Sequence, residues 1–149
     1  MNILTLHTSN VWISVFFSGI TLDGTLYPSP NQMLNLSCNA TGSDRAPESI
    51  DWFHDGNLIE ERKPQWTGRT VILNYLPEVP GHSLISQLTI HGVKSTDAGI
   101  YVCRSMTPSL DMAVRTTSVM VNVLNGKYFI MYHKTINKNI VPPRLSIKN

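Results

Sequence analysis

The sequence predicts an all-β fold, an antiparallel β-sandwich, and three observations support this prediction. Apolar and polar residues alternate with a period of two from about residue 32 to residue 124. Turn-forming residues separate these stretches at intervals of about 8–12 residues. Two cysteines, Cys38 and Cys103, flank a tryptophan, Trp52. No stretch shows a convincing helical period of 3.6 residues, so helices are not expected to form the core.

Seven segments of this region have the pattern of short strands. In the first, Leu34, Leu36 and Cys38 fall on one face. Asp55-Gly56 stands between two apolar runs and predicts a tight hairpin turn. Residues 60–68 are polar and are expected to form a loop. The expected strands are Met33–Asn39, Ile50–Phe53, Leu58–Ile59, Arg69–Tyr75, Leu84–His91, Ile100–Ser105 and Thr116–Leu124.

The spacing of the cysteines and the tryptophan is that of an immunoglobulin core. Trp52 follows Cys38 by 14 residues and precedes Cys103 by 51 residues. Two cysteines by themselves allow one disulfide or two buried thiols. A bridge would close a loop of 66 residues, and the chain-entropy model gives about 4 kcal/mol for such a loop. Trp52 is expected to fill the space beside the bridge.

The segment Asp97–Cys103 strengthens this assignment. Tyr101 lies two residues before Cys103, so both side chains point inward, and the Tyr101 hydroxyl can bond to backbone at the strand corner. A buried Asp97 carboxylate needs a partner, and the guanidinium of Arg69 offers two parallel donors. We therefore expect an immunoglobulin-like sandwich of the I/V-like set with one disulfide between its sheets.

Two sequons flank the first cysteine. Asn35-Leu36-Ser37 and Asn39-Ala40-Thr41 both have the acceptor pattern for N-linked sugar. Alternation along a strand directs Asn35 and Asn39 outward while Cys38 points inward. Sugars could therefore attach without disturbing the core. This arrangement predicts a glycoprotein of an oxidising compartment.

The two ends of the chain lose the strand pattern. Residues 1–24 are expected to be a leader, with Val11–Ile20 as a weak signal-peptide core that lacks a preceding Lys or Arg. Residues 25–125 are the expected immunoglobulin-like domain. Residues 126–149 are an expected unstructured tail with a charge of +5, which we interpret as a solvated segment. No run of 18 apolar residues occurs, so no transmembrane helix is predicted.

Composition and motifs argue against several classes of function. A net charge of +2 is too small to indicate a nucleic-acid binder. The chain has no Gly-x-Ser-x-Gly elbow and no glycine-rich phosphate loop. The five histidines are scattered, and the cysteines lack the short ligand spacing of a zinc site. We therefore expect no enzymatic activity, no cofactor, no metal and no small-molecule substrate.

Alternation also predicts a set of exposed residues on three neighbouring strands of one sheet. An apolar patch with charges at its rim is typical of a protein-contact face. The tail, the loop after Cys103 or a neighbouring domain could instead cover this patch, and the sequence does not decide between these readings. The expected face consists of Asp51, Phe53, Ile100, Val102, Arg104 and Met120.

From Leu26 to about Tyr128 the chain resembles an immunoglobulin domain of the invertebrate Dpr (defective proboscis extension response) and zig-like cell-surface family. It is most similar to the second of the two domains usual in that family. Family members bind related immunoglobulin proteins, the Dpr-interacting proteins, through the first domain. A truncated product, a partial gene model and a secreted fragment would each account for a single domain. The matching segments are Leu34–Cys38, Pro47–Trp52, Gly56–Ile59, Ser86–Ile90, Asp97–Cys103 and Val119–Gly126.

The resemblance implies an extracellular or cell-surface recognition and adhesion module, on the neuronal plasma membrane in a full-length form, with a role in synapse organisation. The expected partners are other immunoglobulin-superfamily surface proteins, with a second copy of the chain as a further candidate. Two alternatives remain open at this point. One is a soluble, secreted immune or ligand-binding immunoglobulin protein, and the other is a spacer domain that binds nothing.

Overall fold

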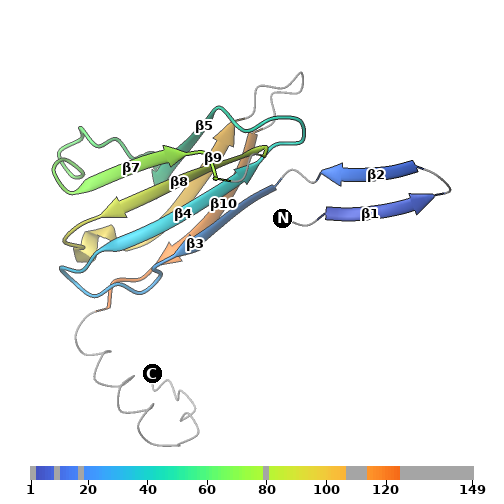
Figure 1. The fold of residues 1–149 in the computed structure, drawn as a ribbon. Coiled ribbons are helices and arrows are strands. Elements are labelled where there is room, and N and C mark those ends of the chain that lie inside the picture. Colours follow the sequence, from blue (N-terminus) through green and yellow to red (C-terminus); the bar gives the residue numbers. More distant parts are fainter. Residues whose placement is uncertain (1–2, 9–10, 17–18, 79–80, 107–113, 125–149) are drawn as a thin grey trace, which may run out of the picture.

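Two antiparallel sheets of four strands pack face to face (Figure 1). The computed structural model describes residues 3–8, 11–16, 19–78, 81–106 and 114–124, the first two ranges as backbone only. The all-β immunoglobulin-like sandwich predicted from the sequence is confirmed. The sandwich strands are β3 (Gly19–Gly24), β4 (Leu34–Thr41), β5 (Ser49–His54), β6 (Asn57–Leu58), β7 (Thr70–Tyr75), β8 (Ser83–Ile90), β9 (Gly99–Met106) and β10 (Val114–Val121).

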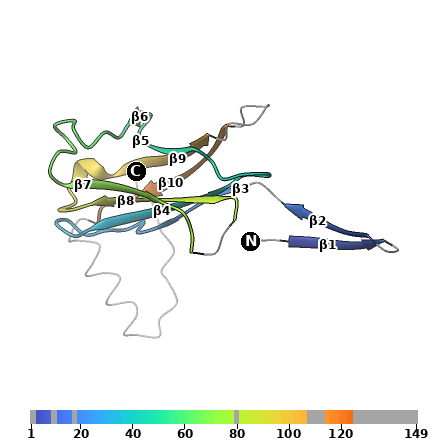
Figure 2. The same ribbon diagram turned by 45° about the horizontal axis from the view of Figure 1, so that its top comes forward.

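The first sheet has the strand order β3-β4-β8-β7, and the second has the order β10-β9-β5-β6. Figure 2 shows the two layers closer to edge-on, with β4 and β8 in one layer and β5 and β9 in the other. Every neighbouring pair is antiparallel. A short 3-10 helix, η1 (Ser95–Asp97), precedes β9. Strands that are distant in sequence therefore become neighbours, as in a sandwich built from Greek-key connections.

The hairpin between β5 and β6 has the two-residue turn that Asp55-Gly56 predicts. His54 pairs with Asn57, so only Asp55 and Gly56 lie in the turn. Both have positive φ, 46° and 79°, which is the requirement of a type I′ turn. The Asp55 carboxylate also accepts a hydrogen bond of 2.8 Å from the backbone N–H of Ile100. The turn is thereby fixed to the start of β9.

The sandwich begins six residues earlier than the boundary expected at residue 25. Strand β3 pairs with β4 in full register from Gly19↔Thr41 to Gly24↔Leu36. Ile20 and Leu22 are half-buried and pack against the core. The stretch from residue 19 therefore belongs to the first sheet. Sequence reasoning missed it because a six-residue edge strand is too short to distinguish from an apolar leader.

After Gly24 the chain crosses from the first sheet to the second. The N–H of Thr25 still bonds the carbonyl of Asn35 in β4 at 2.8 Å. The carbonyls of Leu26 and Pro28 then accept bonds of 2.9 Å from the N–H groups of Asn122 and Leu124. Residues 122–124, which follow directly on β10, thus bond the crossing segment, and β10 itself ends at Val121 rather than at the expected Leu124.

A separate two-stranded sheet is formed by β1 (Ile3–Thr8) and β2 (Val11–Phe16). The two strands pair in antiparallel register from Ile3↔Phe16 to Thr8↔Val11. The expected tail, residues 126–149, lies outside the described residues. Among the described residues, no helix is long and apolar enough to cross a membrane.

The core lies between the two sheets and follows the predicted alternation. Along β4 the inward positions are fully buried while Asn35 and Asn39 are exposed. One core residue was not expected: Trp66, in the polar segment 60–68, is buried. Its indole ring meets the ring of His54 edge-on at 5.6 Å, so the loop covers one end of the core. The buried apolar residues are Leu34, Leu36, Cys38, Ala40, Ile50, Trp52, Ile59, Trp66, Leu84, Leu88, Ile90, Val93, Tyr101, Cys103 and Val121.

Gly24 is expected to be required for the crossing between the sheets. A Cβ atom at this position would lie 2.2 Å from the carbonyl oxygen of Asn35, and φ is +137°. We expect Gly24→Ala to lower the free energy of unfolding in urea by more than about 2 kcal/mol. Gly56→Ala is the matched control, because φ is +79° there but no atom lies within 4 Å, and about 1 kcal/mol is expected. Equal losses would show that the contact with Asn35 is not the constraint.

Candidate protein-contact face

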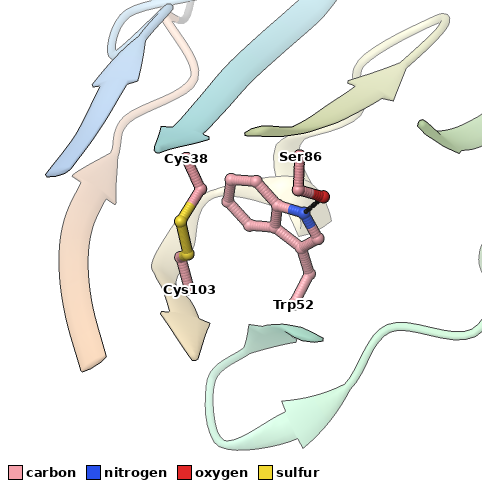
Figure 3. The surroundings of a disulfide bond; sticks show 4 residues. All are labelled: Cys38, Trp52, Ser86 and Cys103. Carbon is pink, nitrogen blue, oxygen red and sulfur yellow. Dashed lines mark hydrogen bonds between the residues drawn. A yellow bond between two sulfur atoms is a disulfide. The ribbon is translucent and has the colours of Figure 1, made fainter. Parts of the chain in front are cut away.

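Two adjacent links join the sheets at the centre of the sandwich (Figure 3). Cys38 on β4 and Cys103 on β9 form a disulfide with a Cα–Cα distance of 6.4 Å. Beside it, the Nε1–H of Trp52 on β5 donates a hydrogen bond of 2.9 Å to the Oγ of Ser86 on β8. Cys38 pairs with Ser86 in one sheet, and Trp52 pairs with Cys103 in the other. The links thus connect two cross-strand pairs that face each other.

The corner before β9 is held by a buried tyrosine. The Tyr101 hydroxyl donates a hydrogen bond of 2.8 Å to the backbone carbonyl of Asp97. Burial is the main cause that raises the pKa of Tyr101, and the negative charge of Asp97 raises it further. The ring also contacts the ring of His54 at a centroid distance of 4.7 Å. The phenol therefore stays protonated and keeps its donor role at physiological pH.

Arg69 and Asp97 form a bidentate ion pair at the same corner. Arg69 Nη1 donates to Asp97 Oδ2 at 2.9 Å, and Nη2 donates to Oδ1. The Asp97 side chain is only 3% exposed, and Oδ2 also accepts a bond of 2.8 Å from the N–H of Lys94. The guanidinium further bonds the carbonyl of Gln65 through Nε at 3.0 Å. This pair fixes the loop before β7 to the start of β9.

The outer face of the second sheet carries all six residues of the expected contact face. Cross-strand register places Asp51 beside Arg104 and Phe53 beside Val102. Met120 on β10 pairs with Ile100 on β9. Paired residues point to the same side of a sheet, so the six side chains share one surface. Ile100 and Met120 are 44% and 51% exposed, and the other four are half-buried.

The two charged residues of this face, Asp51 and Arg104, do not simply stand at the rim of the apolar patch as expected. Arg104 Nη2 bonds Asp51 Oδ2 at 2.7 Å, so the two charges neutralise each other. The Arg104 guanidinium also lies over the ring of Phe53, 4.6 Å from its centroid. Arg104 therefore shields one side of Phe53 from water rather than standing apart from the patch. The sequence could not show this, because β-sheet register decides which charged residue lies beside which ring.

One further residue of the face was not singled out from the sequence. Leu58 on β6 pairs with Phe53 and is 38% exposed. The two-residue turn at Asp55-Gly56 contained the signal, because it fixes Leu58 opposite Phe53. Leu58, Phe53, Val102 and Ser118 consequently form one row across all four strands. The row runs along the hydrogen-bond direction of the sheet.

The two sequon asparagines lie on the opposite surface of the sandwich. Asn35 and Asn39 are exposed on the outer face of β4, in the first sheet. The Oδ1 of Asn35 accepts a hydrogen bond of 2.9 Å from the Thr89 hydroxyl on β8. Sugars at these positions would leave the outer face of the second sheet uncovered.

A hollow of about 310 Å³ lies on the first sheet, and Asp23 is the one titratable residue in its lining. No group of three or more His, Cys, Asp or Glu among the described residues could hold a metal ion. The lining residues of the hollow are Asp23, Gly24, Asn35, Leu36, Ser37, Gln87 and Thr89.

A family model described as an immunoglobulin domain matches residues 20–106, more than half of the chain. The chain belongs to the immunoglobulin-domain family. A solved structure of murine CRIg is similar in fold, with a TM-score of 0.53 and 14% identity over 72% of this chain and 99% of that chain. No curated protein matches the chain significantly. Immunoglobulin domains are generally non-enzymatic and commonly mediate protein–protein contact, which agrees with a recognition module.

The ion pair at the strand corner predicts unequal effects of two arginine substitutions. We expect Arg69→Ala to lower the free energy of unfolding by about 3–5 kcal/mol, because it leaves the Asp97 carboxylate buried without its partner. Arg104→Ala is the control, since its partner Asp51 is 33% exposed and such pairs contribute less than about 1 kcal/mol. Urea unfolding followed by tryptophan fluorescence measures both. Equal losses would contradict the role assigned to Arg69.

The raised pKa of Tyr101 predicts a loss of stability in alkali. Above the ordinary tyrosine pKa of about 10, the unfolded chain releases this proton while the folded chain retains it. The free energy of unfolding therefore falls as the pH rises, by up to about 1.4 kcal/mol per pH unit from this residue. We expect Tyr101→Phe to show a shallower loss above pH 10 in urea unfolding. Tyr75→Phe, at an exposed site, should keep the wild-type slope, and an unchanged slope in Tyr101→Phe would contradict the prediction.

Proposed function

We propose that this chain is an extracellular recognition and adhesion module whose contact surface is the outer face of the β10-β9-β5-β6 sheet. The observation that supports it is that the two outer faces of the sandwich present different residues. One face presents Ile100 and Met120 around a Phe53 that Arg104 partly covers. The other face holds both sequon asparagines. We take the first as the surface for a protein partner and the second as the glycosylated surface.

The geometry of the face supplies both affinity and selectivity. Aromatic and arginine side chains at the centre of an interface contribute most of the binding free energy. Phe53 and Arg104 occupy that position here, with Leu58 and Val102 on either side of Phe53. The Asp51–Arg104 bond orients the guanidinium before a partner arrives. A partner group that accepts a hydrogen bond from the Arg104 guanidinium would be selected over one that places a cation against it.

We propose that the partner is another immunoglobulin-superfamily surface protein and that the setting is neuronal cell-surface recognition and synapse organisation. The resemblance of residues 26–128 to the Dpr and zig-like family supports this setting. In the same proposal, the segment before β3 directs the chain to the secretory pathway, and Asn35 and Asn39 receive N-linked sugar. Self-association through the same face is a second outcome that the experiment separates.

The proposal predicts that two substitutions on the face weaken binding. We expect Phe53→Asp and Val102→Asp to weaken binding to a panel of immunoglobulin-domain ectodomains at least tenfold, which corresponds to about 1.4 kcal/mol. The proteins are secreted from insect cells, and binding is measured by surface plasmon resonance. Self-association is measured by analytical ultracentrifugation, and loss of an observed dimer in both variants would identify a second copy as the partner.

Leu73→Asp is the matched control for these substitutions. Leu73 is an exposed apolar residue at the outer edge of the first sheet, 57% exposed, so its substitution adds the same charge away from the proposed face. It should leave both measurements unchanged. Each variant is first compared with the wild type by thermal unfolding. Folded Phe53→Asp and Val102→Asp variants that bind and associate like the wild type would refute the proposal and favour a spacer domain.

A further inference from the structure

The outer face of the first sheet carries an exposed apolar strip that the proposed contact surface does not use. Three residues of the edge strand β7 point outward, Val71, Leu73 and Tyr75, and they are 40%, 57% and 42% exposed. Ile85 on β8 pairs with Tyr75 and is half-buried. We call these four residues the β7 strip. An exposed edge strand with an apolar face is an aggregation hazard that proteins normally cover or charge.

The register of the sheet puts Asn39 in line with one end of the β7 strip. Asn39 on β4 pairs with Ile85, and Ile85 pairs with Tyr75. Because neighbouring strands are about 4.8 Å apart, Ile85 lies about 5 Å from Asn39 across the sheet and Tyr75 about 10 Å. All three side chains point to the same outer face, since paired residues share a side. Nothing polar separates Asn39 from the ring of Tyr75 along this row.

Asn35 has a different set of neighbours. It pairs with Thr89, and Thr89 pairs with Val71. The Thr89 hydroxyl donates to Asn35 Oδ1 at 2.9 Å, so a polar contact occupies the space beside this asparagine. The row that starts at Asn35 ends at Val71, a small aliphatic side chain. The two sequons on one strand therefore differ in what a sugar attached to each would cover.

We propose that the N-linked glycan on Asn39 lies across the sheet and covers Ile85 and Tyr75. The glycan begins with N-acetylglucosamine, whose C–H face is apolar and whose hydroxyl groups remain hydrated at its edges. Such a face packs on an aromatic ring, because ring hydrogens of the sugar meet the negative face of the π-system. The sugar thus removes apolar surface from water while it presents a polar outer surface to solvent. This inference rests on the secretion assigned under the proposed function.

The Asn39 sugar would also reduce the apolar surface of the first sheet. With Ile85 and Tyr75 under sugar, Val71 and Leu73 are the members of the β7 strip that stay exposed. A bulky sugar beside β7 also hinders pairing of this edge with another chain. The outer face of the second sheet lies on the other side of the sandwich and is left free of this sugar.

Two single-glycan proteins test this assignment. Asn35→Gln keeps only the Asn39 sugar, and Asn39→Gln keeps only the Asn35 sugar. Both are secreted from insect cells and purified folded, and each sugar is then released enzymatically from the native protein. We expect release from Asn35→Gln to raise the fluorescence of an apolar-surface dye at least twofold and to lower Tm by about 3 °C. Release from Asn39→Gln should change neither, since its sugar faces Thr89 and Val71.

A third variant shows whether Tyr75 is the residue covered. Asn35→Gln/Tyr75→Thr carries the Asn39 sugar but lacks the ring, and we expect its dye fluorescence and Tm to be insensitive to release of the sugar. Equal responses of the two single-glycan proteins, or an undiminished response without Tyr75, would overturn the inference. A secreted chain with no sugar at Asn39, read as unchanged gel mobility after release, would overturn it as well. None of these results affects the proposed contact face, which Phe53→Asp tests without reference to sugar.

Discussion

The structure depends on the paired links between its two sheets. The disulfide from Cys38 to Cys103 and the hydrogen bond from Trp52 to Ser86 both run from one sheet to the other. Their ends are cross-strand neighbours, since Cys38 pairs with Ser86 in the first sheet and Trp52 pairs with Cys103 in the second. The disulfide holds the layers together, and the hydrogen bond beside it adds a second fixed point against sliding of one layer over the other. Because side chains alternate along a strand, fixing these inward residues also fixes which residues point outward on both sheets.

The residues that each outer face presents follow from that constraint. On β9 the inward positions of Tyr101 and Cys103 force Ile100, Val102 and Arg104 to the solvent side. On β4 the inward Cys38 forces the sequon asparagines outward on the other layer. The strand corner, held by Tyr101 and the Arg69–Asp97 pair, keeps β9 in register where it supports the contact face. The same core thereby places the proposed contact face and the two sequon asparagines on separate surfaces.

Most of the fold could be predicted because its signals are local. Alternation located seven of the eight strands in the sandwich, and Asp55-Gly56 predicted the hairpin turn that the structure shows. Strand β3 was missed although it pairs with the next strand, β4, because a short edge segment has little pattern of its own. Trp66 was missed for a related reason. Its burial depends on a loop that folds back over His54, and composition described that loop only as polar.

The sequence by itself determined the sandwich, the cysteine pair and the side to which each strand residue points, because a period of two is a property of the backbone. Only the tertiary structure decided the register in which the neighbouring strands pair. That choice placed Arg104 over Phe53 and against Asp51, added Leu58 to the face, and aligned Asn39 with Ile85 and Tyr75. Contacts across a sheet depend on register between segments far apart in the chain, and no local pattern encodes that register.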